Sequence, residues 1–142
     1  MVVGTGASGS MAADGVEERK QMSALIVDDN SVIQKIHKVI MTKLGFETQV
    51  VDNGKMAVDL HTSGCSFDVI LMDMEMPVMN GIEATKELRA MGVETMIVGV
   101  TACSLESEKQ AFKEAGLNEC FVKPLNMEEA KSLVKKLNKE DN

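Results

Sequence analysis

The sequence lacks the features that mark several common classes of protein. Its three cysteines lie far apart and include no CxxC pair, so neither a disulfide framework nor a zinc site is indicated. No apolar run is long enough to span a bilayer, and the first residues lack the basic start and apolar core of a signal peptide. We therefore expect a protein of a reducing compartment, the cytoplasm or also the nucleus.

The chain also lacks an excess of basic residues. It has 15 lysines and arginines against 22 aspartates and glutamates, which gives a net charge of -7 at pH 7. A field of that sign repels a nucleic-acid backbone and an anionic membrane. We expect neither as a partner, and expect a cation or a basic protein surface instead.

Strands and helices are predicted to alternate through one domain, because 142 residues suit a single hydrophobic core. Residues 1–22, with their glycines, small hydroxyl residues and mixed charges, are expected to form a flexible tail. The predicted strands span 24–27, about 47–51, 69–72, 96–100 and 119–122, and the predicted helices span 31–44, 54–61, 82–91, 105–115 and 127–137. This alternation predicts an α/β fold with a single five-stranded parallel sheet and helices on both faces.

The polarity of the strands predicts their order. Residues 24–27, 69–72 and 96–100 are apolar throughout, as buried central strands are, whereas 47–51 and 119–122 carry polar residues suited to edges. The order 2-1-3-4-5, that of a flavodoxin-like three-layer sandwich, satisfies this pattern and the rule of right-handed crossovers. It places a topological switch point between the first and third strands, where ligands collect in such sheets.

Reactive side chains stand where four of these strands end. Asp28 and Asp29 follow the first strand and Asp73 follows the third, while Thr101 and Lys123 follow the fourth and fifth. Parallel strands end at one edge of the sheet, so we expect three carboxylates, a hydroxyl and an ammonium to converge. Each residue alone is explained as well by a helix cap, a turn or a solvated charge. Their coincidence at four strand ends favours a functional site.

The expected carboxylate cluster points to a metal ion, because clustered carboxylates repel one another unless a cation neutralises them. Oxygen ligands without a nearby histidine or cysteine are typical of a hard cation, and Mg²⁺ fits best. Thr101 and Lys123 would then bind the oxygens of a phosphoryl group, with Asp73 as its nucleophile. The sequence thus predicts magnesium-dependent phosphoryl chemistry on Asp73.

Several segments together resemble a known family. Over residues 23–138 they are similar to the motif set of response-regulator receiver domains: Val27-Asp28-Asp29, LMDMEMP around Asp73, Asn80-Gly81, Val100-Thr101-Ala102 and Lys123-Pro124. The stretches MIVGVT and AGLNECFVKPL also resemble the short plant type-C response regulators of cytokinin-type phosphorelays. By this resemblance, residues 23–142 form a receiver domain.

The resemblance implies a role for each site residue. Asp73 would be the phosphoacceptor, and it would hold Mg²⁺ together with Asp28, Asp29 and the backbone carbonyl of Glu75. The donor would be a histidine-containing phosphotransfer protein, supplied in turn by a hybrid histidine kinase. With nothing after the receiver to serve as an output domain, a monomer that acts as a phosphate sink or modulator is expected. It would not be an enzyme beyond its own phosphorylation and dephosphorylation.

The first predicted helix offers a docking surface for the phosphotransfer partner. Its apolar residues form a stripe wider than a single buried face needs. Most of the stripe is expected in the core, but its edge nearest the site, with a segment across the crevice, is expected to dock a partner helix. The docking residues would be Asn30, Val32, Ile33, Ile36, Pro124 and Leu125.

One position departs from the family pattern. The family's conformational switch uses an aromatic residue three positions before the lysine, and here that position is Cys120. Phe121 comes one place later and, because a strand alternates faces, should point to the other side of the sheet. We therefore expect the usual output face to change little on phosphorylation.

Two other functions remain open from the residues alone. An aspartyl-phosphate phosphatase for small phosphate esters would carry a general acid two residues after Asp28, where this chain has Asn30. A binding module without chemistry would not need the full set of site residues.

Two local expectations complete the sequence interpretation, one for the histidines and one for a proline. His37 and His61 are expected to be surface or hydrogen-bonded histidines without a role in phosphotransfer. The Lys123-Pro124 bond is expected to be trans, since only about 5 to 6% of X-Pro bonds are cis.

Overall fold

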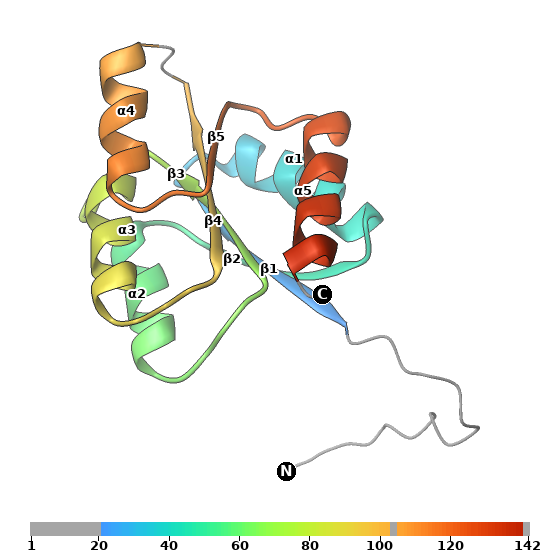
Figure 1. Ribbon diagram of the computed structural model, residues 1–142, viewed down its shortest axis with the longest axis horizontal. Helices are drawn as coiled ribbons and strands as arrows, with labels where there is room; N and C mark the ends of the chain where they lie inside the picture. The colour runs from blue at the N-terminus through green and yellow to red at the C-terminus, as the bar shows by residue number, and fades with distance from the viewer. Residues whose placement is uncertain (1–20, 103–104, 141–142) are drawn as a thin grey trace.

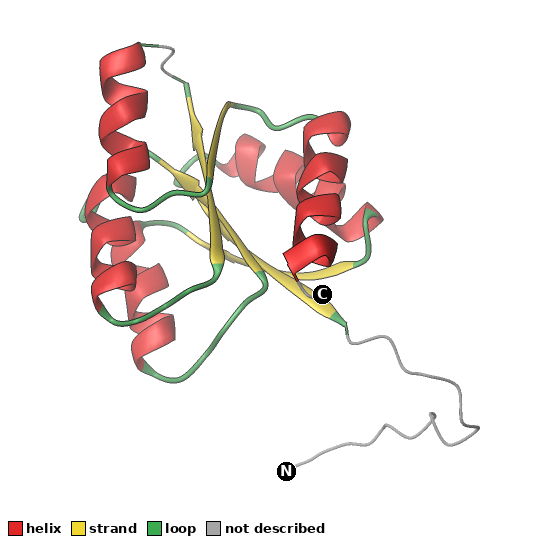
Figure 2. Ribbon diagram, viewed as in Figure 1, coloured by secondary structure: helices red, strands yellow, loops and turns green. Residues whose placement is uncertain are grey.

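Five strands alternate with five helices in the computed structural model, which describes residues 21–102 and 105–140 (Figures 1 and 2). The strands are β1 (Met22–Val27), β2 (Phe46–Val51), β3 (Val69–Asp73), β4 (Met96–Thr101) and β5 (Glu119–Val122). The helices are α1 (Ser31–Lys43), α2 (Gly54–Thr62), α3 (Gly81–Ala90), α4 (Glu106–Glu114) and α5 (Met127–Glu140). Every predicted element is present. The expected tail lies outside the described residues except at its end, where Met22 begins β1.

The sheet is parallel throughout and has the predicted order β2-β1-β3-β4-β5. The strands β3 and β4 are buried at every position, while the two edge strands are partly exposed. Alternate side chains enter two separate hydrophobic clusters, one on each face of the sheet. Helices α1 and α5 cover one face, and α2, α3 and α4 cover the other (Figure 1). The predicted three-layer α/β architecture is confirmed. None of the described helices is both long and apolar enough to cross a membrane.

Polar caps begin the helices that follow β1 and β3. The side-chain oxygen of Asn30 accepts the N–H groups of Val32 and Ile33, at 2.9 and 3.1 Å. Asn80 and Glu83 form a capping box, in which each side chain accepts the backbone N–H of the other residue. These caps fix the turns that lie against the carboxyl edge of the sheet.

Gly81 allows α3 to begin against the end of β3. Its N–H donates to the carbonyl of Met74 at 2.8 Å. A Cβ at this position would overlap the backbone carbonyl of Asp73. Only glycine permits this approach, so the Asn80-Gly81 turn helps to fix the backbone at Asp73.

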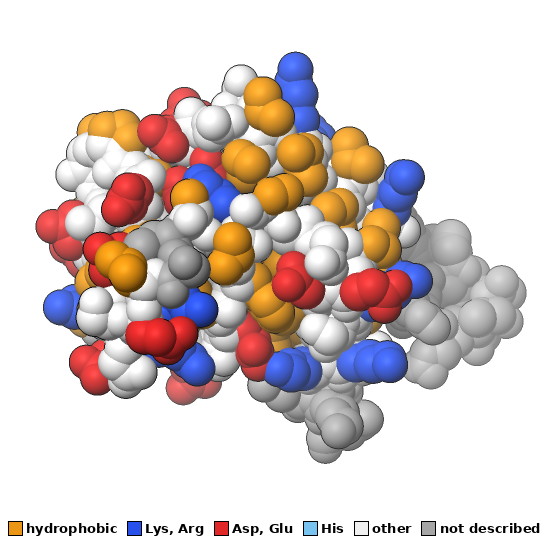
Figure 3. Space-filling model, turned by 90° about the horizontal axis from the view of Figure 1, so that it is seen from above, with side chains coloured by type: hydrophobic (Ala, Val, Ile, Leu, Met, Phe, Trp, Pro, Cys, Tyr) orange, Lys and Arg blue, Asp and Glu red, His pale blue; other side chains and the backbone are white. Residues whose placement is uncertain are grey.

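Hydrophobic side chains are exposed along α1, where they gather on the surface seen in Figure 3. Val32 is 62% exposed and Val39 is 52% exposed, while Ile36 is partly buried. The fully buried residues of this helix are His37 and Met41, which lie one turn apart. The expectation that most of the apolar stripe is core is therefore only partly right, because the side of α1 that faces the sheet includes a histidine.

Candidate functional site

Three carboxylates meet at the carboxyl edge of the sheet. One oxygen from each of Asp28, Asp29 and Asp73 lies within 4.8 Å of the others. Asp28 and Asp73 are buried, whereas Asp29 is exposed. The Asp28 carboxylate accepts the N–H of Asn30 at 2.9 Å, which ties it to the turn before α1. The structure thus brings together the three acids that the sequence places after β1 and at the end of β3.

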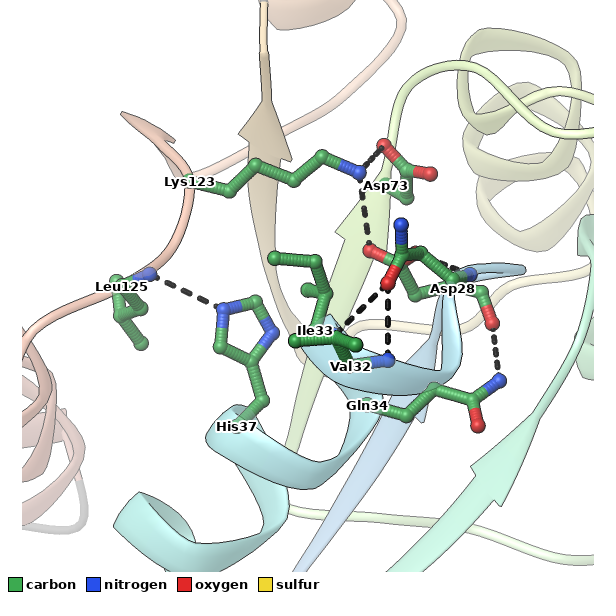
Figure 4. Close-up of polar contacts among 9 residues, drawn as sticks. Asp28, Val32, Ile33, Gln34, His37, Asp73, Lys123 and Leu125 are labelled. Carbon is green, nitrogen blue, oxygen red and sulfur yellow. Dashed lines mark hydrogen bonds and ion pairs between the residues drawn. The ribbon is translucent and has the colours of Figure 1, made fainter.

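Lys123 brings a positive charge into this cluster (Figure 4). Its ammonium nitrogen lies 3.1 Å from Oδ1 of Asp73 and 3.2 Å from Oδ2 of Asp28. Burial alone would lower the pKa of Lys123, but the hydrogen bond and charge of Asp73, together with Asp28, outweigh burial and raise it. The backbone N–H of Lys123 donates to the carbonyl of Thr101 at 2.9 Å, which fixes the end of β5 against β4. Lys123 is therefore a positioned, charged ammonium.

The Asp73 carboxylate is buried and only partly satisfied. Burial is the main reason that its pKa rises from 3.8 to about 6, and the charge of Asp28 raises it further. The hydrogen bond and charge of Lys123 and the N–H of Glu75 lower this pKa but do not offset the increase. Among the described residues, Oδ2 of Asp73 has no hydrogen-bond partner. A buried carboxylate oxygen in that state is costly unless it binds something else.

A cavity of about 280 Å³ lies beside this carboxylate. Its walls are formed by Asp73, Glu75, Thr101, Ala102 and Lys123. Thr101 is 1% exposed, and the small Ala102 side chain leaves room next to it. The cavity therefore has a nucleophilic oxygen, an ammonium and a hydroxyl in its walls. This set can hold a small anion such as a phosphoryl group against a carboxylate.

The carboxylates fit a hard divalent cation. They offer oxygen ligands only, which is the donor type that Mg²⁺ prefers. Oδ2 of Asp73, which has no hydrogen-bond partner in the part of the chain that the structure describes, adds an oxygen that is available for coordination. Asp28, Asp29 and Asp73 would be the side-chain ligands, and two of the three are already buried against the sheet.

The predicted docking residues divide into exposed and buried ones. Asn30, Val32 and Pro124 are exposed, and Ile33 and Ile36 are partly buried. Leu125 is only 1% exposed, so its assignment to the docking surface is wrong. It packs in the core beneath α1 and α5, because an apolar residue just before α5 is better placed against the sheet than in water.

The Lys123-Pro124 peptide bond is cis, so the expectation of a trans bond is wrong. That expectation rested on the local preference of X-Pro bonds. Such a preference does not take into account the tertiary contacts that residues on both sides of the bond make in the folded protein. Lys123 is held in two ion pairs, and the N–H of Leu125 donates to His37.

His37 is hydrogen-bonded, which is one of the two states expected from the sequence, but its buried place beside the site was not predicted. It is fully buried, and its Nε2 accepts the backbone N–H of Leu125 at 3.0 Å (Figure 4). Its position one turn from Met41, on the helix face toward the sheet, was the available signal. His61 is partly buried, and its Nδ1 lies 2.8 Å from the carbonyl oxygen of Ala57 within α2.

Known proteins share this fold and much of the sequence. A family model for the response regulator receiver domain matches residues 24–135. Two-component response regulator 24 of Arabidopsis thaliana is 52% identical over 118 residues, covering 83% of this chain and 85% of that protein.

Two solved structures extend the comparison. The receiver domain of the sensor histidine kinase PA1611 from Pseudomonas aeruginosa, with a magnesium ion in its active site cleft, matches with a TM-score of 0.73 at 30% identity, covering 83% of this chain and 98% of that one. The second is the co-crystal structure of the Saccharomyces cerevisiae phosphotransfer protein Ypd1 with the receiver domain of Ssk1. It matches with a TM-score of 0.70 at 29% identity, covering 82% of this chain and 86% of that one. The chain belongs to the response regulator receiver domain family, and within it resembles the type-C-like response regulators of plants.

Proposed function

We propose that this receiver accepts a phosphoryl group on Asp73 in a phosphorelay. The observation that carries the proposal is the state of the Asp73 carboxylate. It is buried at the end of β3, it has an oxygen without a hydrogen-bond partner among the described residues, and it forms part of a cavity wall with Lys123 and Thr101. A merely structural carboxylate would be expected to have both oxygens satisfied at such depth.

In the proposed reaction, an oxygen of Asp73 attacks the phosphorus of a phosphohistidine. The P–N bond breaks as the new P–O bond forms, and the electron pair of the broken bond returns to the imidazole nitrogen of the donor. Lys123 carries three N–H donors, so it can keep a contact to Asp28 while donating to an oxygen of the transferred group. The Thr101 hydroxyl, which belongs to a residue of the same cavity wall, is proposed to bind a second oxygen.

Mg²⁺ is the proposed cofactor. When bound, it supplies positive charge that offsets the repulsion between the carboxylates and the incoming phosphoryl oxygens. Asp28, Asp29 and Asp73 would hold it, with the backbone carbonyl of Glu75. The magnesium ion in the cleft of the Pseudomonas aeruginosa receiver supports this assignment.

The proposed donor is a histidine-containing phosphotransfer protein that docks on α1. The docking surface is the α1 patch, which we define as Val32, Ile36 and Val39. It is apolar, with Val32 and Val39 exposed and Ile36 partly buried, and it lies on the helix that follows Asp28 and Asp29. The exposed Lys35 and Lys43 lie on the same helix. An apolar helix face with an acidic rim would complement this patch. The yeast complex, in which a receiver is bound to the phosphotransfer protein Ypd1, supports such a partner.

The wider role that we propose is a phosphate sink or modulator in a cytokinin-type relay of the cytoplasm or nucleus, fed by a hybrid histidine kinase. Phosphatase activity on small esters is disfavoured by Asn30. Its side chain is an amide, which cannot act as a general acid, and its oxygen already caps α1.

The test is phosphate incorporation from acetyl phosphate and from a phosphorylated phosphotransfer protein, both with Mg²⁺. The wild-type protein should be labelled, and Asp73→Asn should not, because the amide keeps the shape and loses the nucleophile. Asp59→Asn makes the same chemical change on the exposed side of α2 and should keep full labelling. Labelling that persists in Asp73→Asn would show that the acceptor lies elsewhere.

A further inference from the structure

The side chain of His37, a residue of α1, contacts the segment that carries Lys123. Its ring is fully buried, and Leu125, whose N–H it binds, is also buried. Lys123 is two residues before Leu125, and the residue between them is a proline, which has no N–H. The bond to His37 is therefore made by the first backbone donor that follows Lys123. Figure 4 shows the ring of His37 facing Leu125 on the same side of the site as Lys123.

The contact requires a neutral imidazole with a defined tautomer. Because Nε2 accepts a hydrogen bond, the ring proton must be on Nδ1. Among the described residues, Nδ1 has no hydrogen-bond partner. Burial lowers the pKa of His37 from 6.5 to about 4, with Asp28 raising it and Lys123 lowering it by smaller amounts. The acceptor is thus present throughout the neutral range.

Helix α1 is connected to both partners of the ion pair between Lys123 and Asp28. On one side, Asp28 accepts the N–H of Asn30, the residue that caps α1. On the other side, His37 of α1 holds Leu125, two residues from Lys123. The N–H of Lys123 is held in turn by the carbonyl of Thr101 on β4. The segment from Lys123 to Leu125 is therefore fixed by one hydrogen bond to the sheet and one to α1.

We propose that His37 is a positioning residue for phosphoryl acceptance: it fixes the backbone at Leu125 so that the Lys123 ammonium stays against Asp73. The inference rests on the proposed function, since Lys123 matters here only if Asp73 accepts phosphate. His37 neither contacts the phosphoryl group nor exchanges a proton in this role. It acts through geometry, and a misplaced lysine slows a transfer that depends on orientation.

The experiment compares two substitutions of His37 under labelling with acetyl phosphate, a donor too small to need a docking surface. His37→Leu replaces the imidazole with an apolar side chain of similar length and removes the acceptor. His37→Gln restores an acceptor oxygen near the place of Nε2. Loss of one hydrogen bond at a positioning residue should slow labelling about tenfold in His37→Leu, and His37→Gln should stay within about twofold of wild type. His61→Leu, a change of the same type on α2, should have no effect.

A double-mutant cycle separates positioning of Lys123 from general damage to the fold. In a Lys123→Ala background, the further change His37→Leu should alter the residual labelling rate by less than about twofold, because the residue through which His37 acts is gone. If the two changes multiply to the product of their separate effects, His37 does not act through Lys123 and the inference is wrong. Equal rates for wild type and His37→Leu would also overturn it while leaving Asp73 as the acceptor. A wild-type protein that takes up no phosphate would instead remove the proposed function, and the inference with it.

A measurement on the unmodified protein covers the case in which His37→Leu does not fold. The ¹⁵N NMR spectrum of the His37 ring should show a protonated Nδ1 and a bare Nε2 at neutral pH. A proton on Nε2 would exclude the hydrogen bond from Leu125 and so would overturn the proposal without any variant.

Discussion

Lys123 and Asp73 form an ion pair although their strands are not neighbours in the sheet. The 3.1 Å contact between Nζ and Oδ1 passes the end of β4, which separates β5 from β3. The same ammonium lies 3.2 Å from Asp28, so it offsets part of the repulsion between the two buried carboxylates. One ammonium cannot neutralise the whole cluster, because exposed Asp29 adds a third negative charge.

The residual negative charge predicts stabilisation by Mg²⁺. Binding to the folded state should raise the free energy of unfolding by RT ln(1 + [Mg²⁺]/Kd), which is about 2.7 kcal/mol when the ion is at 100 times its Kd. Asp28→Asn should reduce this response, since it removes one of the buried ligands. The measurement is the thermal midpoint as a function of Mg²⁺ concentration.

The matched control for the metal prediction is Asp59→Asn, which removes one negative charge from the exposed surface of α2. Its Mg²⁺ response should equal that of wild type. If Asp28→Asn and Asp59→Asn respond alike, the ion acts by general screening and the cluster is not its site.

The α1 patch predicts a donor-specific defect. Val32 is 62% exposed, so Val32→Lys should leave the fold intact while placing a charge in the proposed interface. Phosphotransfer from the phosphotransfer protein should slow by tenfold or more, because a buried interfacial charge without a partner costs at least about 1.4 kcal/mol. Labelling by acetyl phosphate should not change. The comparison of the two donor rates is the measurement.

Met56 provides a control for this substitution. It is a half-exposed apolar residue of α2, which covers the opposite face of the sheet from α1. Met56→Lys should leave both donor rates unchanged. Equal slowing of both donors by Val32→Lys would mean that the fold was damaged, and slowing by Met56→Lys would mean that the partner docks elsewhere.

His37 predicts a pH dependence of stability. Its pKa in the folded protein is about 4, below the value of 6.5 in an unfolded chain, so the unfolded state takes up a proton first as the pH falls. The His37 contribution is therefore lost progressively below pH 6.5, by about 2 kcal/mol between pH 7 and pH 5. Asp73 acts with the opposite sign, because its pKa is raised to about 6 and its folded form takes up a proton before the unfolded form does.

A comparison of variants isolates the histidine from the aspartate. His37→Gln keeps Asp73 and removes the titrating ring, so its stability relative to wild type should rise by about 2 kcal/mol from pH 7 to pH 5. Urea unfolding at several pH values, without Mg²⁺, measures the difference. Parallel curves for the two proteins would show that His37 keeps an ordinary pKa and is not buried as described.

Most of the fold and the convergence at the strand ends could be predicted because they follow from polarity along the chain. Apolar strands must be central, and parallel strands end at one edge, so Asp28, Asp73 and Lys123 had to approach one another once the strand order was known. Neighbouring strands lie close together in a sheet, so the backbone alone brings these three residues near one another, whatever the packing of the other side chains.

The contacts around α1 could not be predicted in the same way. Hydrophobicity ranks Val32 as a better core residue than His37, yet Val32 is exposed and His37 is buried. The choice depends on which side of the helix faces the sheet and on a backbone donor, Leu125, that is 88 residues away in the chain. Contacts of this kind, between residues far apart in the chain, could not be read from the sequence. For that reason Leu125 was predicted on the surface and the Lys123-Pro124 bond was predicted to be trans.

The two faces of β5 predict how far a signal can spread. Cys120 packs with the cluster beneath α2, α3 and α4, and Phe121 packs with the cluster beneath α1 and α5. Phe121 therefore lies on the opposite face of the sheet from the position that the family's aromatic switch residue would take. Phosphorylation should draw Thr101 toward the site without a large side chain moving behind it.

The expected outcome is a response confined to the site. Amide chemical shifts with Mg²⁺ and beryllofluoride, a phosphoryl mimic, should change around Asp28, Asp73, Thr101 and Lys123, and much less along α4 and β5. Asp73→Asn is the control and should show no response to beryllofluoride. A cysteine side chain is too small to make the movement expected of an aromatic switch residue, so a small response on α4 and β5 is expected from its size. Shifts on α4 and β5 as large as those at the site would mean that a switch operates without the aromatic residue, and a role as a phosphate sink would then lose its structural basis.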